Sequence, residues 1–254
     1  MYLVGSKYLI LILAENIFMR VVVLFWFLSI QMSAQISVVK LKKASLIANE
    51  IIFSKLNNDD ISSGLKEALR IGVDYSVNMS SKNEGFYKNS FIKIPFPKEA
   101  NKIKETFFKF GIQSKVEAFE YIINEAASDA SILAKDIFIE EINNIRINDA
   151  LSILKGKDNA ATTYLKNNTT KQLYAKFKPV IINSINKTKL LEAWEVLLVK
   201  YNSLPFTKKI NVDLEEYVTK KTLEGLFKLI EKEEMNIRTN PKARVTENLQ
   251  KIFK

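Results

Sequence analysis

Residues 57–77 read NNDDISSGLKEALRIGVDYSV, and they point most directly to the fold class of the chain. Leu65, Leu69, Val73 and Val77 recur every four residues, which places them on one face of an α-helix. The asparagines and aspartates that open the stretch supply side-chain oxygens for the free N–H groups of a first helical turn. The stretch therefore predicts an amphipathic helix with a polar start.

Apolar residues recur at helical spacing through most of the chain that follows. Buried faces are expected at Ile103, Phe107 and Phe110, at Val116, Phe119, Ile123 and Ala126, at Leu214, Val218, Leu223, Phe227 and Ile230, and at Val245 and Leu249. Helix starts are expected at Pro97, Gln113, Asn148–Asp149, Asp158, Thr169–Thr170, residue 188, Asp213 and Pro241, with a C-cap at Gly111, a break near Ser128–Ser131 and a kink or break at Pro179. The predicted fold class is all-α, a single multi-helix, bundle-like domain.

One segment, residues 83–97, interrupts the helical pattern. Pro95 and Pro97 forbid a regular helix there, and the segment is rich in phenylalanine and isoleucine. We expect an extended aromatic loop held against the body of the domain. Its aromatic residues, with those up to Phe119, indicate ordinary core, and the alternative is an apolar groove for lipid or a partner peptide. Gly225 lies inside a predicted helix, which suggests close packing against a neighbouring helix.

Residues 19–35, MRVVVLFWFLSIQMSAQ, have the order of a secretory signal peptide. The apolar run of about ten residues is shorter than the roughly twenty that span a bilayer. We expect a signal peptide over residues 1–35 with the true start at Met19, a partly helical segment over 36–56 and an all-helical domain over 57–254. An uncleaved anchor and a buried core helix are the alternatives. No cysteine is present for lipid attachment, so the expected product is periplasmic and soluble, not a lipoprotein.

The composition excludes several kinds of chemistry. The chain has no cysteine and no histidine, so thiolate nucleophiles, histidine bases, Cys/His zinc sites and disulfides are impossible. The net charge of +10 comes mostly from lysine, whereas arginine, which binds phosphates and guanine with two parallel hydrogen bonds, is scarce. We therefore expect neither a nucleic-acid partner nor a bound metal or cofactor.

Two groups of residues are weak candidates for a binding site. Glu234 and Arg238 are four apart and can pair on one helix face, where a solvated ion pair is the ordinary interpretation and a carboxylate acid/base or metal site the sharper one. Asp158, Thr162 and Tyr164 surround a predicted helix start whose free N–H groups could attract an anion in a polar pocket. The ordinary interpretation there is a helix capped by Asp158 and packed through its alanines.

Several blocks, from SSGLKEALRIGVDYSV to LQKIF, together resemble a bacterial family, domain of unknown function 4197, over about residues 57–254. The resemblance implies an exported, all-helical protein of Gram-negative bacteria. It implies no activity, so no catalytic residues are transferred. The family's central block often reads Asn-Arg-Ala-Ala-Glu, whereas residues 124–128 read Asn-Glu-Ala-Ala-Ser and lack both of its charged residues.

These observations favour a non-catalytic binding or scaffolding protein of the bacterial periplasm or envelope, with an apolar or anionic ligand. One alternative is a hydrolase-type enzyme that uses Asp, Glu, Lys or Tyr. Another is a protein that binds membranes peripherally through its lysines.

Overall fold

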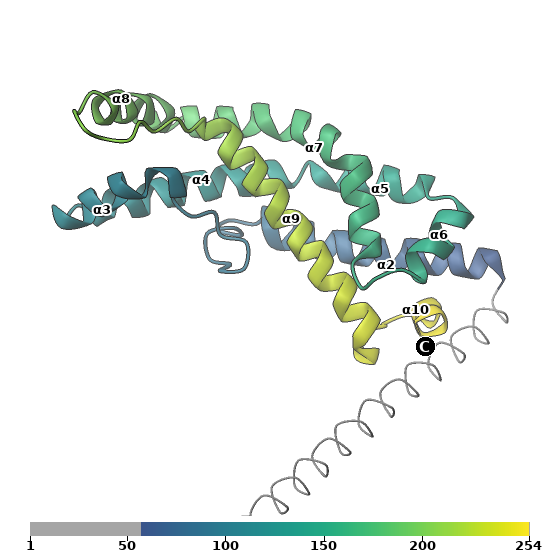
Figure 1. Ribbon diagram of the computed structural model, residues 1–254. Helices are drawn as coiled ribbons and strands as arrows, with labels where there is room; N and C mark the ends of the chain where they lie inside the picture. The colour runs from purple at the N-terminus through teal and green to yellow at the C-terminus, as the bar shows by residue number, and fades with distance from the viewer. Residues whose placement is uncertain (1–56, 254) are drawn as a thin grey trace, which may run out of the picture. The chain divides into compact units, whose positions relative to one another are not determined.

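The computed structural model describes residues 57–253, and the expectations for residues 1–56 lie outside that range. All regular elements within residues 57–253 are helical, which confirms the predicted all-α class (Figure 1). In chain order they are α2 (Asn58–Ser81), η1 (Lys98–Ala100), α3 (Asn101–Lys109), α4 (Gln113–Ser131), α5 (Ala134–Asn144), α6 (Ile147–Leu154), α7 (Ala160–Asn186), α8 (Leu190–Asn202), α9 (Leu214–Thr239), η2 (Pro241–Ala243) and α10 (Glu247–Ile252).

Helix α2 confirms the prediction made from its sequence. The side chain of Asn57 accepts a hydrogen bond from the N–H of Asp60 at 2.6 Å and caps the helix. The four residues of the predicted stripe, from Leu65 to Val77, are all buried. Helix α2 packs against α4, α5, α6, α9 and α10.

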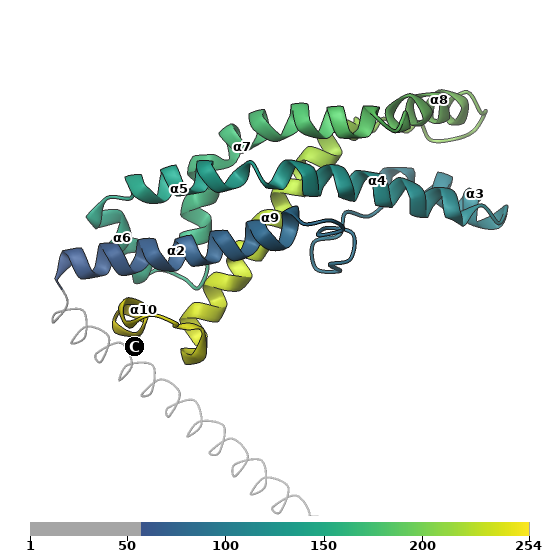
Figure 2. The same ribbon diagram turned by 180° about the vertical axis from the view of Figure 1, so that it is seen from behind.

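Helix α9 crosses α2, α4 and α7 and packs against all three (Figures 1 and 2). Asp213 caps it, as predicted, by accepting from the N–H of Glu216 at 2.9 Å. The predicted buried faces of α9 and of α4 are confirmed, and the break expected near Ser128–Ser131 falls where α4 ends at Ser131. Phe138 of α5 and Phe227 of α9 meet edge to face, with ring centroids 5.7 Å apart.

Two predicted helix caps are wrong by one or two residues. Asn148 and Asp149 lie inside α6, which begins at Ile147 after Arg146. Asp158 does not cap α7, because that helix begins at Ala160 after Asn159, whose side chain makes no capping hydrogen bond. The sequence signal failed at α7 because a residue from another helix supplies the cap.

Helix α7 is one continuous helix where two were expected. Thr169 and Thr170 do not start a helix, and their hydroxyls donate to the carbonyls of Leu165 and Lys166, four residues earlier. Of the kink or break expected at Pro179, the break does not occur, since α7 continues past this residue. Figure 1 shows α7 changing direction along its length. Back-bonded threonines and a proline without an N–H both favour such a bend.

Several apolar residues expected in the core are exposed. Phe110 is 76% exposed and Val245 is also exposed, whereas Phe107 is half-buried. Helix α3 packs chiefly against α4, and Ile103 is its one buried residue. The prediction of ordinary core holds for Phe86, Phe96 and Phe119 but is wrong for Phe91, Phe108 and Phe110.

None of the helices within residues 57–253 is both long and apolar enough to cross a bilayer.

Candidate functional site

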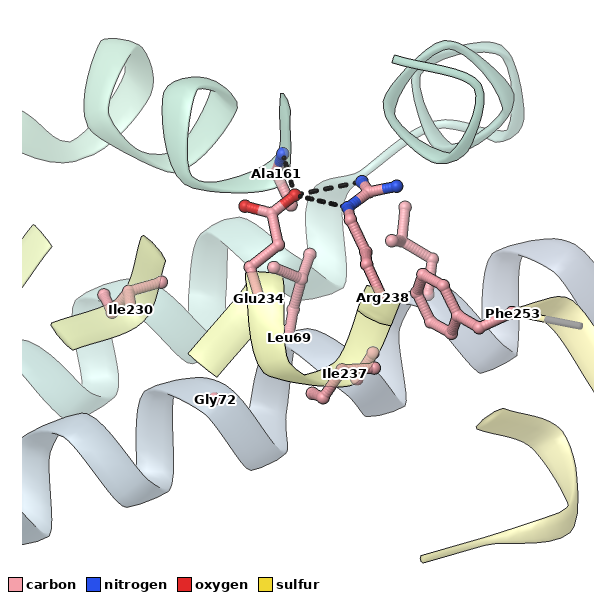
Figure 3. Close-up of a pocket in the computed structure, with 10 residues that line it drawn as sticks. Leu69, Gly72, Ala161, Ile230, Glu234, Ile237, Arg238 and Phe253 are labelled. Carbon is pink, nitrogen blue, oxygen red and sulfur yellow. Dashed lines mark hydrogen bonds and ion pairs between the residues drawn. The ribbon is translucent and has the colours of Figure 1, made fainter. Parts of the chain in front are cut away.

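Glu234 of α9 lies against the first turn of α7 (Figure 3). Its Oε1 accepts a hydrogen bond from the N–H of Ala161 at 2.9 Å, and its Oε2 accepts from the N–H and the hydroxyl of Thr162 at 2.8 and 2.7 Å. A carboxylate in this position satisfies two backbone donors that the helix cannot and opposes the positive end of the helix dipole. We refer to Glu234, Arg238, Ala161 and Thr162 as the Glu234 hub.

Arg238 extends the hub to a third helix. Its Nε and Nη2 donate to Oε1 of Glu234 at 3.0 and 2.9 Å. Its Nη1 and Nη2 also donate to the carbonyls of Leu154 and Ile153, at 3.1 and 2.9 Å, where α6 ends. The guanidinium thus meets the negative end of α6 while the carboxylate meets the positive end of α7, so one ion pair of α9 joins three helices.

The hub corrects two expectations from the sequence. The side chains of Glu234 and Arg238 are only 7% and 10% exposed, so their ion pair is buried, not solvated. The first N–H groups of α7 are bound by Glu234 and cannot attract an anion. The cavity beside the hub, next to Leu69 and Phe253, has a volume of about 20 Å³, which is room for roughly one water molecule (Figure 3). The hub is therefore a structural joint.

The other predicted site residues lie elsewhere. Asp158 is exposed. Tyr164 is half-buried, and its burial and then its hydrogen bond to Glu141 raise the pKa of its hydroxyl to about 12. Thus Thr162, Glu234 and Arg238 come together, but no hydrogen bond or ion pair among the described residues joins Asp158 or Tyr164 to them.

An open groove with a volume of about 370 Å³ lies between α9 and the loop segment 90–99. Gly225 forms part of its wall, where a Cβ atom would lie 2.7 Å from Cε1 of Phe86 and 3.3 Å from Cβ of Ile92. The close packing expected at Gly225 is therefore confirmed, but its partner is the loop and not a helix. We call this feature the lysine groove.

The charges of the lysine groove are only partly paired. Lys93 binds Glu120 at 3.2 Å and Lys221 binds Glu224 at 2.6 Å. Among the residues that the structure describes, no ion pair engages the other lining lysines, Lys98 and Lys228. Because both are exposed and lie beside the same hollow, they are available to a ligand from solvent.

A neighbouring hollow of about 310 Å³ extends this basic surface, since Ser90 lines both. Together the two hollows are lined by seven lysines, 82, 88, 93, 98, 221, 228 and 232, and three glutamates, 84, 99 and 224, a net charge of +4. Lys232 also lies over the exposed ring of Phe91, with 5.5 Å from its Nζ to the ring centroid. A concave surface of this sign concentrates small anions.

Tyr217 ties α9 to the loop across the lysine groove. Its hydroxyl donates a hydrogen bond to the carbonyl of Pro95 at 2.9 Å. Burial, and then the negative charges of Glu99, Glu224 and Glu120, raise the pKa of this hydroxyl to about 12. The hydroxyl therefore stays protonated at neutral pH and keeps donating to the loop.

Helix α4 holds the other side of the loop through side chains that bind loop backbone. Asn124 is buried, accepts from the N–H of Ile94 at 2.8 Å and donates to the carbonyl of the same residue at 2.8 Å. Three further bonds run from the N–H groups of Phe96, Glu84 and Phe86 to Glu120, Glu125 and Ser128 at 3.1, 2.9 and 3.3 Å. The block 124–128 thus positions the loop through Asn124, Glu125 and Ser128.

The sequence did not reveal Lys98, Tyr217 or Lys228 as candidates. Lys221 and Lys228 are seven apart on one helix and share a face, which is the one local signal for the groove. The opposite wall comes from a loop more than 100 residues earlier, whose position depends on α4. Neither charge spacing nor periodicity carries that information.

The family model described as protein of unknown function (DUF4197) matches residues 55–254. No curated protein and no solved structure matches the chain.

Proposed function

The chain belongs to this family of unknown function, and we propose that it acts as a non-catalytic binding protein for a small anionic ligand held in the lysine groove. The observation that carries the proposal is the presence of two exposed lysines, Lys98 and Lys228, without an ion-pair partner in the described residues, beside one hollow of about 370 Å³. Ligand pockets commonly have volumes of about 300–1,000 Å³.

The fixed walls of the groove support this proposal. Asn124 binds both backbone groups of Ile94, Tyr217 binds the carbonyl of Pro95, and Gly225 lets the loop approach α9 closely. A site whose walls are already held in place loses little conformational freedom when a ligand binds. The lysines can then contribute charge without first requiring the loop to order.

The chemistry of the groove favours binding over catalysis. The hydroxyl of Tyr217 has a pKa of about 12 and donates a hydrogen bond to the carbonyl of Pro95, so it is poorly suited to act as a base near neutral pH. Glu224 is exposed and paired with Lys221. Glu234, the one buried carboxylate among residues 57–253, is fully engaged in the hub. These features speak against the hydrolase alternative.

The proposal includes export to the periplasm of a Gram-negative bacterium, in line with the signal-like run at residues 19–35. N-terminal sequencing of the protein isolated from such a host tests this part separately. A mature chain that begins near Gln35 is expected, and an intact N-terminus at Met1 would contradict it.

Calorimetric titration of the full chain with inorganic phosphate, and in parallel with glycerol 1-phosphate, tests the ligand proposal. We expect the double variant Lys98→Ala/Lys228→Ala to bind at least about tenfold more weakly, since two charge-assisted contacts are lost. The control Lys157→Ala/Lys251→Ala removes the same charge from exposed positions outside the groove and should bind as the parent does. Equal weakening in both double variants, or no binding by the parent protein, would refute the proposal.

A further inference from the structure

Two turns of the described unit expose large apolar side chains. The first, residues 107–112, joins α3 to α4 and exposes Phe108, Phe110 and Ile112. The second, residues 199–206, follows from the end of α8 and exposes Val199, Leu204 and Phe206. We call these turns the two tips. Figures 1 and 2 show α3 and α8 at the same end of the helical unit, from opposite sides, so the tips project at one end.

The backbone holds both tips in defined conformations. Gly111 has a φ of +67°, and the N–H groups of Gly111 and Ile112 donate to the carbonyls of Phe108 and Phe107 at 3.1 and 2.9 Å. This is the usual way in which glycine ends a helix. The exposure of Phe110 is therefore built into the turn and is not the result of a loose chain end.

The second tip is held by side chains. Asn202 binds both backbone groups of Ile210, at 2.7 and 2.8 Å, and the hydroxyl of Thr207 donates to the carbonyl of Leu204 at 2.9 Å. Phe206 itself has a φ of +62°, which is uncommon for a residue with a bulky side chain, and its ring is fully exposed. The strained backbone at Phe206 exposes the ring to solvent, so the ring adds no buried contacts that stabilise the fold. This points to a role for the ring outside the fold.

Lysines surround both tips. Lys102, Lys109 and Lys115 flank the first, and Lys200, Lys208 and Lys209 flank the second, whereas the only acid within residues 102–115 and 200–209 is Glu105. Within residues 57–253, no ion pair involves any of these six lysines. Exposed aromatic rings among exposed lysines that form no ion pair in the described range match the two layers of an anionic bilayer surface, which are the acyl boundary and the charged headgroups.

We propose that this end of the helical unit docks on the surface of an anionic bilayer, with Phe110 and Phe206 entering the interface and the lysines contacting headgroups. A second copy of the chain fits less well. A symmetric contact through the tips would bring lysine-rich surfaces of like charge together, which is unfavourable. The proposal concerns a different surface from the lysine groove, so either can fail without the other.

Single-cysteine labelling tests this proposal sharply, because the chain contains no cysteine of its own. Ser114→Cys and Ser203→Cys place a fluorophore beside each tip, and Asn148→Cys places one on α6, at an exposed position remote from α3 and α8 (Figure 1). With full chains and phosphatidylcholine vesicles containing phosphatidylglycerol and a spin-labelled quencher lipid, we expect strong quenching at residues 114 and 203 and little at 148. Local quenching separates docking by the tips from attachment through any other part of the chain.

A second set of variants separates the apolar from the charged contribution. Phe110→Ser/Phe206→Ser should reduce the quenching at residue 203 severalfold, and Lys208→Glu/Lys209→Glu should remove its dependence on phosphatidylglycerol and on low salt. Val245→Ser, which removes an equally exposed apolar side chain near α10, should have no effect. Equal quenching at all three labels, no response to the tip variants, or a stable dimer without quenching would overturn the proposal.

Discussion

The Glu234 hub and the lysine groove are two polar regions that share helix α9. The charges of the hub are buried and paired, whereas two lysines of the groove are exposed and have no ion-pair partner among the described residues. In the hub, the carboxylate and guanidinium are nearly removed from water, and each binds backbone groups of another helix. In the groove, Lys98 and Lys228 lie in solvent without an ion-pair partner in the described part of the chain.

The contrast shows where function can be sought in this chain. A buried charge that has all its partners serves the architecture, because releasing any partner leaves another group unsatisfied. A charge that is exposed beside a concave surface and has no ion-pair partner is available to bind a ligand. The pair that looks most like a site in the sequence is therefore the joint, and the lysines that looked like ordinary surface line the candidate site.

The largest effect should come from breaking the hub. Glu234→Ala leaves Arg238 and two backbone donors of α7 buried without their acceptor, so we expect a loss of about 3–5 kcal/mol in the free energy of unfolding. Urea denaturation measures this loss. Glu224→Ala, which breaks the exposed pair with Lys221 in the groove, should cost less than about 1 kcal/mol. Similar losses in the two variants would contradict the distinction between joint and groove.

The next effect concerns the wall of the groove. Asn124→Ala removes both hydrogen bonds to the backbone of Ile94, and we expect a loss of about 2–3 kcal/mol with faster amide exchange at Ile94. Asn89→Ala is the matched control, since Asn89 also accepts a hydrogen bond from loop backbone, the N–H of Phe91, but this hydrogen bond is exposed. If the exchange rate at Ile94 rises equally in both variants, the wall is not held by α4.

Replacing two glycines by alanine should change the free energy of unfolding in opposite directions. Gly225→Ala places a Cβ atom 2.7 Å from the buried ring of Phe86, so overpacking should outweigh the gain in helix propensity and cost about 1 kcal/mol net. Gly72→Ala, beside the hub cavity, meets nothing closer than 3.8 Å, at Glu233, and should stabilise the protein by about 0.5–1 kcal/mol. Thermal denaturation of the two variants gives the sign directly. If Gly225→Ala were stabilising, Phe86 and Ile92 would be able to move away from the added methyl group at little cost.

The smallest expected effect is a pH dependence of the free energy of unfolding, which arises from Glu120 at the base of the loop. Burial acts to raise the pKa of Glu120, but the N–H of Phe96 together with Lys104 and Lys93 outweighs it, and the pKa is lowered. A carboxyl group with a lowered pKa stabilises the fold above its unfolded value, about 4.3, and this contribution disappears as the pH falls through the folded pKa. Glu120→Gln should therefore be less stable than the parent at pH 7 and lose less stability on acidification.

Glu125→Gln should change stability in the opposite direction to Glu120→Gln. The midpoints of urea denaturation at pH 7 and pH 3.5 measure the stability of both variants. Burial, and then the charges of Asp129 and Glu84, raise the pKa of Glu125 against the opposing bond from the Glu84 N–H. With a raised pKa, the stabilising contribution is present at low pH and is lost as the pH rises through the folded pKa. Glu125→Gln should therefore gain stability relative to the parent at pH 7. The same sign for both variants would contradict these assignments.

The features of the fold that could be predicted from the sequence are those that depend on residues close together along the chain. Asn57 and Asp213 cap the helices that they were expected to cap, and the stripes of α2, α4 and α9 are buried, because capping and periodicity involve residues within one or two turns. The pairing of Glu234 with Arg238 follows from the same local geometry.

What the sequence could not show depends on residues far apart in the chain. The burial of Glu234 requires α7, whose first turn lies more than 70 residues earlier and uses Glu234 in place of its own cap at Asp158. The lysine groove likewise needs Tyr217 and Pro95 to meet. Periodicity in the sequence does not predict such long-range contacts, so the candidate site could be identified only from the structure.

The packing of α2 against α10 has a consequence for how the molecule is made. A Cβ atom on Gly64 would lie 2.9 Å from Cδ1 of Ile252, and the amide of Asn248 donates to the carboxylate of Glu67 at 2.9 Å. Within residues 57–253, the first helix is thus covered in part by the last one. A chain that is still being synthesised therefore leaves this part of α2 uncovered until α10 has been made.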